Sequence, residues 1–270
     1  MMSDNMMKRT HLPYQLIIFF SLATTSCTKV IDLKLGNDTG KLVIEGNITN
    51  VNGPQYIRLS QNVPFYNTNT YPPITGATIA VHDQVGNNYT FTEGPPGTYS
   101  INSLTGIIGN TYTVNILANG KSYTAHSTMP TLVVLDTITS KPSLLNGSKR
   151  TITVHYQDPP KIANQYRFVM YVNGVQVNSF FTFNDMFTDG RYVNVDIVEN
   201  DIDIYPGSTV TVEMQCIDQL TYTYWYTLAT QSANGAGGGV APSNPPNNIT
   251  PLTLGYFSAH TSQSKTIVVQ

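Results

Sequence analysis

The sequence predicts an all-β protein made of two β-sandwich domains with one short helix. Thr (35 residues), Asn (25) and Tyr (17) are abundant in the 270-residue chain. Thr and Tyr favour strands, and Asn favours turns. Short alternating runs recur between turn residues at the spacing of a sandwich. Asn119-Gly120 and Asn173-Gly174 each separate two such runs, and this dipeptide is a strong hairpin signal.

Residues 1–26 are predicted to be a signal peptide that ends before Cys27. After the basic pair Lys8-Arg9, the segment Leu12–Ala23 is apolar but shorter than the roughly 20 residues that span a bilayer. Small residues then precede Cys27, as in bacterial lipoprotein signals, although threonine stands three residues before it where leucine is usual. We expect Cys27 to carry lipid. The alternative is an ordinary secretory signal followed by a structural cysteine.

The second cysteine, Cys216, lies in the alternating run VTVEMQCID. It is predicted to be a small buried hydrophobe rather than a nucleophile. A disulfide between Cys27 and Cys216 is the alternative. Residues 27–40 are expected to form a tether that leads into the fold.

Residues 41–130 are predicted to form the N-terminal β-sandwich. Its expected strands are Lys41–Ile48, Tyr56–Ser60, Ala77–Asp83, Tyr89–Thr92, Thr98–Ile101, Thr111–Ala118 and Ser122–Ser127. Residues 131–270 are predicted to form the C-terminal β-sandwich, with a boundary placed to within several residues. Its expected strands are Leu132–Ser140, Thr151–Tyr156, Gln165–Val172, Val175–Phe181, Tyr192–Val198, Thr209–Ile217 and, at the end, Lys265–Val269.

The segment Asp218–Gln231 fits two patterns. Its tyrosines at 222, 224 and 226 alternate as in a strand, whereas Leu220, Tyr224 and Leu228 are four apart, as on a helix face. Asp218 can cap a helix, and fourteen residues without a turn signal is long for a strand here. We therefore predict a helix near 218–232, followed by a Gly/Pro-rich loop over Asn234–Pro251.

Several blocks of the sequence resemble the "domain of unknown function 4249" family of Bacteroidota lipoproteins. The matching pieces are CTKVIDL (27–33), KLVIEGNIT (41–49), IRLSQNVPF (57–65), ITGATIAVHD (74–83), GTYS (97–100) and LGYFSAHTSQSKTIVV (254–269). The resemblance implies an exported lipoprotein, often encoded beside TonB-dependent outer-membrane receptors, and brings no catalytic motif. The predicted N-terminal domain also resembles transthyretin-like or immunoglobulin-like sandwiches, and the predicted C-terminal domain resembles a fibronectin type III-like sandwich. Such analogies carry no function by themselves.

The composition and motifs indicate no nucleic-acid partner, metal or cofactor. Charged residues make up 11% of the chain and the net charge is −2, so a basic face is lacking. Asp185 and Asp189 precede a turn at Gly190, and such oxygen ligands could hold Ca²⁺. Their spacing is not that of an EF-hand loop, and an Asx-turn is the preferred explanation. Neither a Gly-x-Ser-x-Gly elbow nor a P-loop occurs.

Aromatic residues are the stronger functional hint. Tyr66 and Tyr71 lie on a Pro-rich loop, and Tyr222, Trp225 and Tyr226 crowd the predicted helix. Exposed Tyr and Trp offer large contact areas at low entropic cost, which suits an interface. The helix residues could instead pack the helix on a sheet, although one stripe cannot bury all of them, so at least one should stay accessible.

These observations favour a non-enzymatic protein anchored by lipid in the outer membrane. We expect it to be an accessory or binding component of a TonB-dependent transport system, on either the periplasmic or the surface face. A stand-alone surface module that binds glycans or peptides is the alternative. A hydrolase would need clustered acids or a Ser/His pair in a cleft.

Overall fold

The computed structural model describes residues 39–64, 70–198, 201–233 and 243–270. The predicted all-β class is confirmed, and within these ranges one helix accompanies the strands. The predicted signal peptide, Cys27 and tether lie outside the described residues. None of the helices in the described ranges combines the length and apolar character needed to cross a bilayer.

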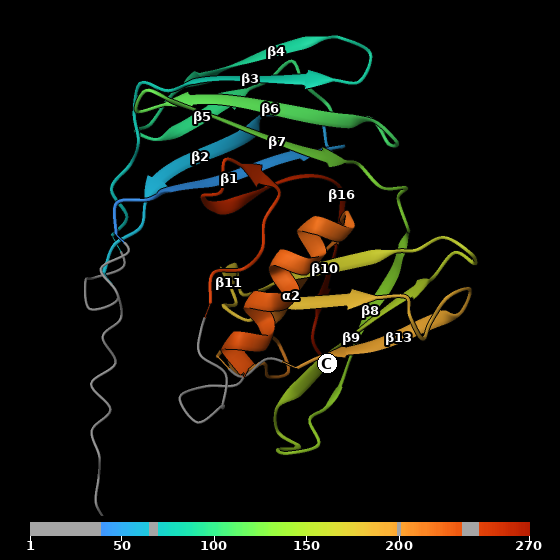
Figure 1. The fold of residues 1–270 in the computed structure, drawn as a ribbon. Helices are drawn as coiled ribbons and strands as arrows, with labels where there is room; N and C mark the ends of the chain where they lie inside the picture. Colours follow the sequence, from blue (N-terminus) through green and yellow to red (C-terminus); the bar gives the residue numbers. More distant parts are fainter. Residues whose placement is uncertain (1–38, 65–69, 199–200, 234–242) are drawn as a thin grey trace, which may run out of the picture. The chain divides into compact units, whose positions relative to one another are not determined.

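The first sandwich consists of two layers that enclose one apolar core. Its strands are β1 (Leu42–Thr49), β2 (Gln55–Gln61), β3 (Thr78–Asp83), β4 (Asn88–Glu93), β5 (Thr98–Ile101), β6 (Thr111–Ala118), β7 (Lys121–Thr128) and β15 (Ile249–Thr250). They follow the order β1-β2-β5-β4-β3-β6-β7-β15, and Figure 1 shows β3, β4 and β6 stacked on β1 and β2. In β1, Leu42, Ile44 and Ile48 point into this core because side chains alternate along a strand.

The second sandwich has its own core between two further layers. Its strands are β8 (Leu135–Pro142), β9 (Arg150–Gln157), β10 (Gln165–Val172), β11 (Val175–Gln176), β12 (Phe181–Asn184), β13 (Tyr192–Ile197) and β14 (Thr209–Cys216). One layer is the three-stranded sheet β13-β9-β8, and β10 and β14 lie in the other. Cys216 is buried in this second core with a free thiol, as its apolar setting predicts.

A single long strand, β16 (Leu254–Val268), belongs to both sandwiches. Residues 254–260 pair in parallel with β1, and residues 261–268 pair antiparallel with β14. Phe257 and Ala259 are buried in the first core, and Val269 is buried in the second. The predicted last strand began only at Lys265, so the structure extends it by eleven residues toward the N-terminus.

Two tight positions fix β16 against β1. Gly255 has a φ of +97°, and a Cβ built on it would lie 1.9 Å from the carbonyl oxygen of Ile44. A Cβ on Gly46 would lie 2.7 Å from the ring of Phe257. Only glycine allows the backbones and the ring to approach this closely.

Both predicted Asn-Gly hairpins are confirmed. Asn119 and Gly120 have φ values of +50° and +71° and connect β6 to β7. Asn173 and Gly174 have +50° and +81° and connect β10 to β11. Two successive residues with positive φ are what a type I′ turn requires.

The predicted helix is confirmed as α2 (Gln219–Ala233), which excludes the strand alternative for this segment. Asp218 caps it, because its carboxylate accepts the backbone N–H of Thr221 at 2.8 Å. The other carboxylate oxygen of Asp218 accepts the Ser127 hydroxyl from β7. The cap therefore also ties the start of the helix to the first sandwich.

The domain boundary near residue 130 stays a prediction. A C-terminal segment contributes to the core of the N-terminal sandwich. The first apolar core draws on residues 42–129 together with Ile249, Phe257 and Ala259, and the second draws on residues 133–216 together with Val269. Residues 39–270 cluster as one compact unit. The cause is β16, which hydrogen-bonds to both sandwiches.

Candidate functional site

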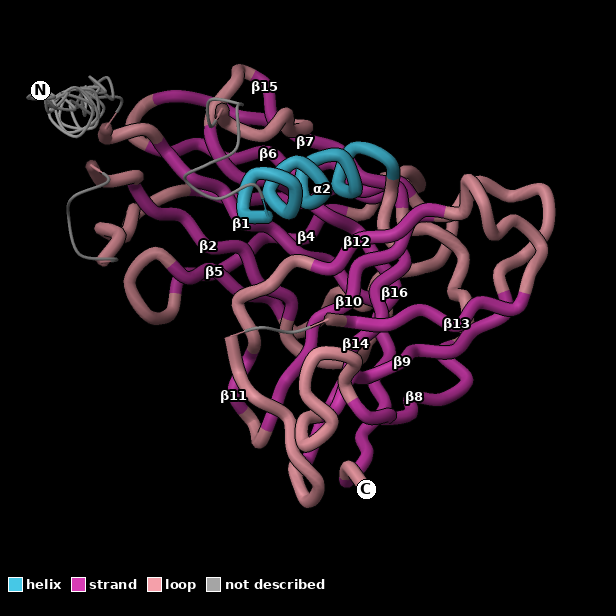
Figure 2. The backbone as a smooth tube through the Cα atoms, turned by 90° about the horizontal axis from the view of Figure 1, so that it is seen from below, coloured by secondary structure: helices cyan, strands magenta, loops and turns pink. Residues whose placement is uncertain are grey.

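The outward face of the β10–β14–β16 layer carries the helix. Tyr166 and Phe168 of β10 point into the second core, so Arg167 between them points to the opposite face. Likewise, Phe257 of β16 points into the first core and Tyr256 points outward. Helix α2 contacts β10, β12 and β16 on this face; Figure 1 shows it beside β10, and Figure 2 shows it beside β12.

The aromatic residues of α2 form a small cluster of their own with the strands below. Tyr222 and Trp225 are each 8% exposed, which shows that they pack the helix on the sheet. The rings of Trp225 and Tyr256 are 5.0 Å apart, and those of Tyr224 and Tyr256 are 5.2 Å apart. Tyr226 is 49% exposed, so one member of the group does remain accessible.

Arg167 is held against this cluster in a fixed orientation. Its guanidinium carbon lies 3.8 Å from the centre of the Trp225 ring, which is a cation–π contact. Its Nη1 donates to Gln215 Oε1 at 2.9 Å, and Gln215 Nε2 donates to Glu213 Oε1 at 2.8 Å. Ser262 Oγ donates to the same Glu213 oxygen at 2.7 Å. Burial lowers the pKa of Arg167, because desolvation disfavours the charged form.

Two cavities open beside this cluster and share one residue, Tyr71. The first measures about 690 Å³, and its lining includes Tyr71, Arg167 and Phe180. The second measures about 380 Å³, and its lining includes Tyr71, Glu45 and Tyr224. Both fall in or near the size range of small-molecule sites.

The structure brings most of the predicted interface residues to one place. Tyr71 is 52% exposed and lines both cavities, while Tyr222, Trp225 and Tyr226 lie on the adjoining helix. Tyr66 lies outside the described residues, as does Cys27. The aromatic group is therefore partly core and partly surface.

Three participants were missed by reasoning from the sequence. Arg167 and Phe180 line the larger cavity, and Tyr256 supports Trp225 from below. Arg167 did leave a signal, because it is the one cation in the otherwise apolar run QYRFVMYV. Tyr256 left none, because an aromatic residue in a strand is ordinary. Phe180 was hidden in the predicted strand Val175–Phe181, which is wrong in part, because β11 ends at Gln176 and Phe180 lies in the loop before β12.

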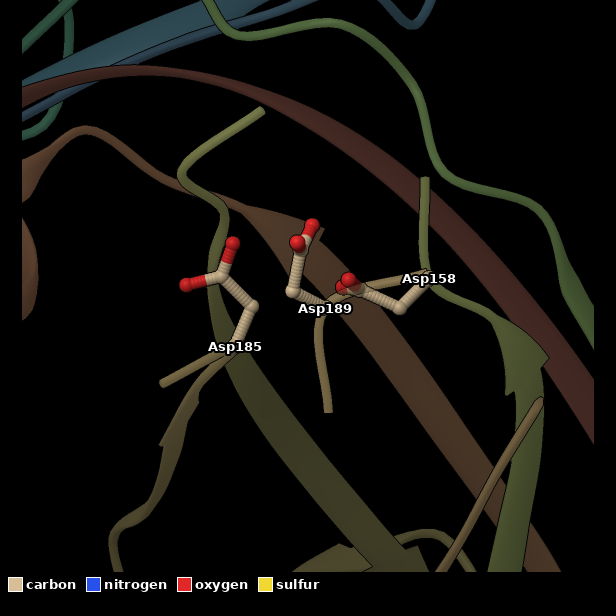
Figure 3. A group of neighbouring side chains, drawn as sticks. All are labelled: Asp158, Asp185 and Asp189. Carbon is tan, nitrogen blue, oxygen red and sulfur yellow. The ribbon is translucent and has the colours of Figure 1, made fainter. Parts of the chain in front are cut away.

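A second cluster contains three aspartates. One carboxylate oxygen from each of Asp158, Asp185 and Asp189 lies within 4.8 Å of the others, and Figure 3 shows the three side chains converging. Asp158 follows β9 and is fully buried, whereas Asp189 is exposed. The sequence had paired Asp185 with Asp189 only, because Asp158 is distant along the chain.

The oxygens of this cluster accept hydrogen bonds from the surrounding loops. Asp185 accepts the backbone N–H of Asn164 at 2.8 Å, and Asp189 accepts that of Lys161 at 2.6 Å. Asp158 accepts the Tyr166 hydroxyl and the backbone N–H of Gly190. These hydrogen bonds connect the loop of residues 158–164 to the loop of residues 185–190, and this structural role explains the cluster without a metal ion. The same oxygens belong to the donor class that Ca²⁺ prefers.

Burial raises the pKa of Asp158, and the nearby charges of Asp185 and Asp189 raise it further. The hydrogen bonds from Tyr166 and Gly190 act in the opposite direction. Burial also raises the pKa of Tyr166, to which the charge of Asp158 adds. Tyr166 therefore keeps its proton and donates it in the hydrogen bond to the Asp158 carboxylate.

Three comparisons place this chain among known proteins. No curated protein matches this chain. Among solved structures, the Yersinia pseudotuberculosis adhesin InvE is similar at 17% identity, with a TM-score of 0.20 and coverage of 66% of this chain. The chain spans 57% of the length of that adhesin. The family model described as "Domain of unknown function (DUF4249)" matches residues 28–266. The chain therefore belongs to the domain of unknown function 4249 family.

Proposed function

We propose that this chain is a non-enzymatic binding protein, anchored by lipid at Cys27 in the outer membrane. In this role it is an accessory or binding component of a TonB-dependent transport system. The observation that carries the binding role is the pair of cavities that meet at the exposed side chain of Tyr71. A concave site with aromatic walls and a few fixed polar groups is the usual form of a binding site.

The anchoring part of the proposal rests on the residues around Cys27. A basic pair, a short apolar run and small residues precede this cysteine, and the family match begins immediately after it, at residue 28. Each methylene buried in a bilayer contributes about 0.8 kcal/mol, so two or three acyl chains hold a folded domain stably. Confinement to a surface raises the effective concentration of the domain near a membrane partner. Positioning is thus the mechanism.

Co-purification from mild detergent tests the transport role. The tagged full-length chain should recover an outer-membrane receptor, and Cys27→Ser should lose both membrane association and the receptor. Mass spectrometry of the membrane fraction should find Cys27 acylated. An unmodified Cys27, or a soluble wild-type protein, would refute the anchor, and repeated recovery without any receptor would refute the transport role.

The alternative is a stand-alone surface module that binds glycans or peptides. The exposure of Tyr71 on the cavity lining and of Tyr226 on α2 favours it, because exposed tyrosines stack on sugars and peptide side chains. A glycan array separates the two functions. Binding that is lost in Tyr71→Ala, in a chain that recovers no receptor, would favour the stand-alone module.

A further inference from the structure

Among the described residues, no carboxylate forms an ion pair with the guanidinium of Arg167. In the described part of the chain, the ion pairs join Lys141 to Asp196 and Lys149 to Asp203, and neither includes Arg167. Yet the side chain of Arg167 is half-buried and lines the larger cavity. Glu213 acts on this cation only from a distance, through Gln215, so its charge is incompletely compensated, and its place on a cavity wall points to a ligand that supplies further negative charge.

The surroundings of Arg167 hold the guanidinium ready for such a ligand. Trp225 fixes one face of its plane, and Gln215 accepts from a single nitrogen, Nη1. An arginine carries five N–H donors, so the Gln215 bond leaves donors for a second acceptor. The planar fork matches the two oxygens of a carboxylate.

The rest of the cavity wall suits a small polar ligand. Gln176, Asn178 and Ser179 contribute amide and hydroxyl groups that can bond to ligand hydroxyls. Phe180 and Tyr71 contribute aromatic surfaces. The volume of about 690 Å³ admits a molecule of the size of a monosaccharide or small organic acid.

The charge of the site favours a carboxylate over a phosphate. Glu213 stands behind Arg167, linked to it through the amide of Gln215. Its negative charge weakens the positive potential at the site, whereas the desolvation penalty of a ligand grows with the square of its charge, so a monoanionic carboxylate is favoured over a dianionic phosphate. We propose that the cavity lined by Arg167, Asn178 and Phe180 binds a small ligand through its carboxylate, an organic acid or acidic sugar.

This inference deepens the binding role proposed above and rests on it, but not on the membrane anchor or on a receptor. Trp225 is the single tryptophan of the chain and touches Arg167, so its fluorescence reports directly on the site. The experiment titrates the full-length chain in detergent with acetate, succinate and glucuronate. Glucose serves as the uncharged match for glucuronate, and inorganic phosphate as the other anion.

At least one of the three carboxylates should change the Trp225 fluorescence saturably, and glucose should not. Arg167→Gln, which can still donate to Gln215, should weaken that binding at least tenfold. Asn178→Phe, an exposed position, should block the cavity and weaken binding similarly without disturbing the fold. Arg58→Gln, at an exposed position of β2, is the matched control and should bind like the wild type.

The inference is overturned if none of the three carboxylates gives a saturable change. It is equally overturned if phosphate binds more tightly than every carboxylate, or if both cavity variants bind like the wild type. A chain that binds a carboxylate but recovers no receptor would leave this site standing and remove only the transport role. The two failures are thus distinguishable.

Discussion

His260 of β16 is buried where the fold opposes its protonation. It is 2% exposed, and its Nδ1 lies 3.0 Å from Ser258 Oγ. Burial lowers its pKa, and the positive charge of Arg167 lowers it further, whereas Glu213 raises it. The net result is a pKa of about 4, against 6.5 in the unfolded chain. His260 therefore stays neutral in the folded protein at any pH above about 5.

This difference makes the stability depend on pH in a defined window. Because the folded pKa is depressed, the unfolded chain binds more protons between pH 6.5 and about 4. The free energy of unfolding gained by burying the neutral imidazole of His260 is fully present above pH 6.5 and is lost as the pH falls toward 4. Each pKa unit corresponds to 1.36 kcal/mol, so the whole loss is about 3 kcal/mol. Between pH 7 and 4.5 the expected loss is roughly 2 kcal/mol.

Urea unfolding at pH 7.0, 5.5 and 4.5 measures this loss. The free energy of unfolding of the wild type should fall by roughly 2 kcal/mol more than that of His260→Gln. Taking the difference between the two proteins cancels the titration of the carboxylates they share. His126→Gln, an exposed histidine on β7, is the control and should follow the wild type. Parallel profiles for wild type and His260→Gln would refute the reasoning.

Three further predictions concern packing, charge and the cavity rim. Gly255→Ala should cost more than about 3 kcal/mol or prevent folding, whereas Gly76→Ala, whose Cβ meets nothing within 4 Å, should cost only about 1 kcal/mol in urea unfolding. Asp189→Asn keeps the acceptor for Lys161 and removes repulsion toward Asp158, so thermal melts should show a gain of about 0.5 kcal/mol at pH 7. A wild-type melting temperature lowered by chelator would contradict the metal-free account of this cluster. Tyr71→Ala should leave the melting temperature within about 2 °C of the wild type, because the side chain is half exposed.

The strands with one buried face could be predicted from the sequence, because alternation is a local signal. The run LVIEGNIT predicts β1 because apolar side chains recur with a period of two. The Asn-Gly pairs predict two hairpins because both residues accommodate the positive φ of the turn. The helix was predictable from its cap at Asp218 and its fourfold spacing. Each of these signals lies within a dozen residues of the element it predicts.

The first half of β16 escaped prediction because both of its faces are covered. Residues 255–261 are all buried, with Phe257 in the first core and Tyr256 beneath α2. A strand buried on both sides shows no polar alternation. The site was hidden for a related reason: Tyr71, Arg167 and Trp225 come from three distant segments, and only the tertiary pairing of β1, β16, β14 and β10 brings them together.

The dual membership of β16 sets the order in which the molecule can be assembled. The first core lacks Phe257 and Ala259 until the segment 254–268 has been synthesised, although its strand β1 spans residues 42–49. Closing that long loop is slow compared with forming the local hairpins. Until β16 docks, the N-terminal half therefore has an open sheet edge at β1. We expect the two cores to be completed together, when this shared strand docks.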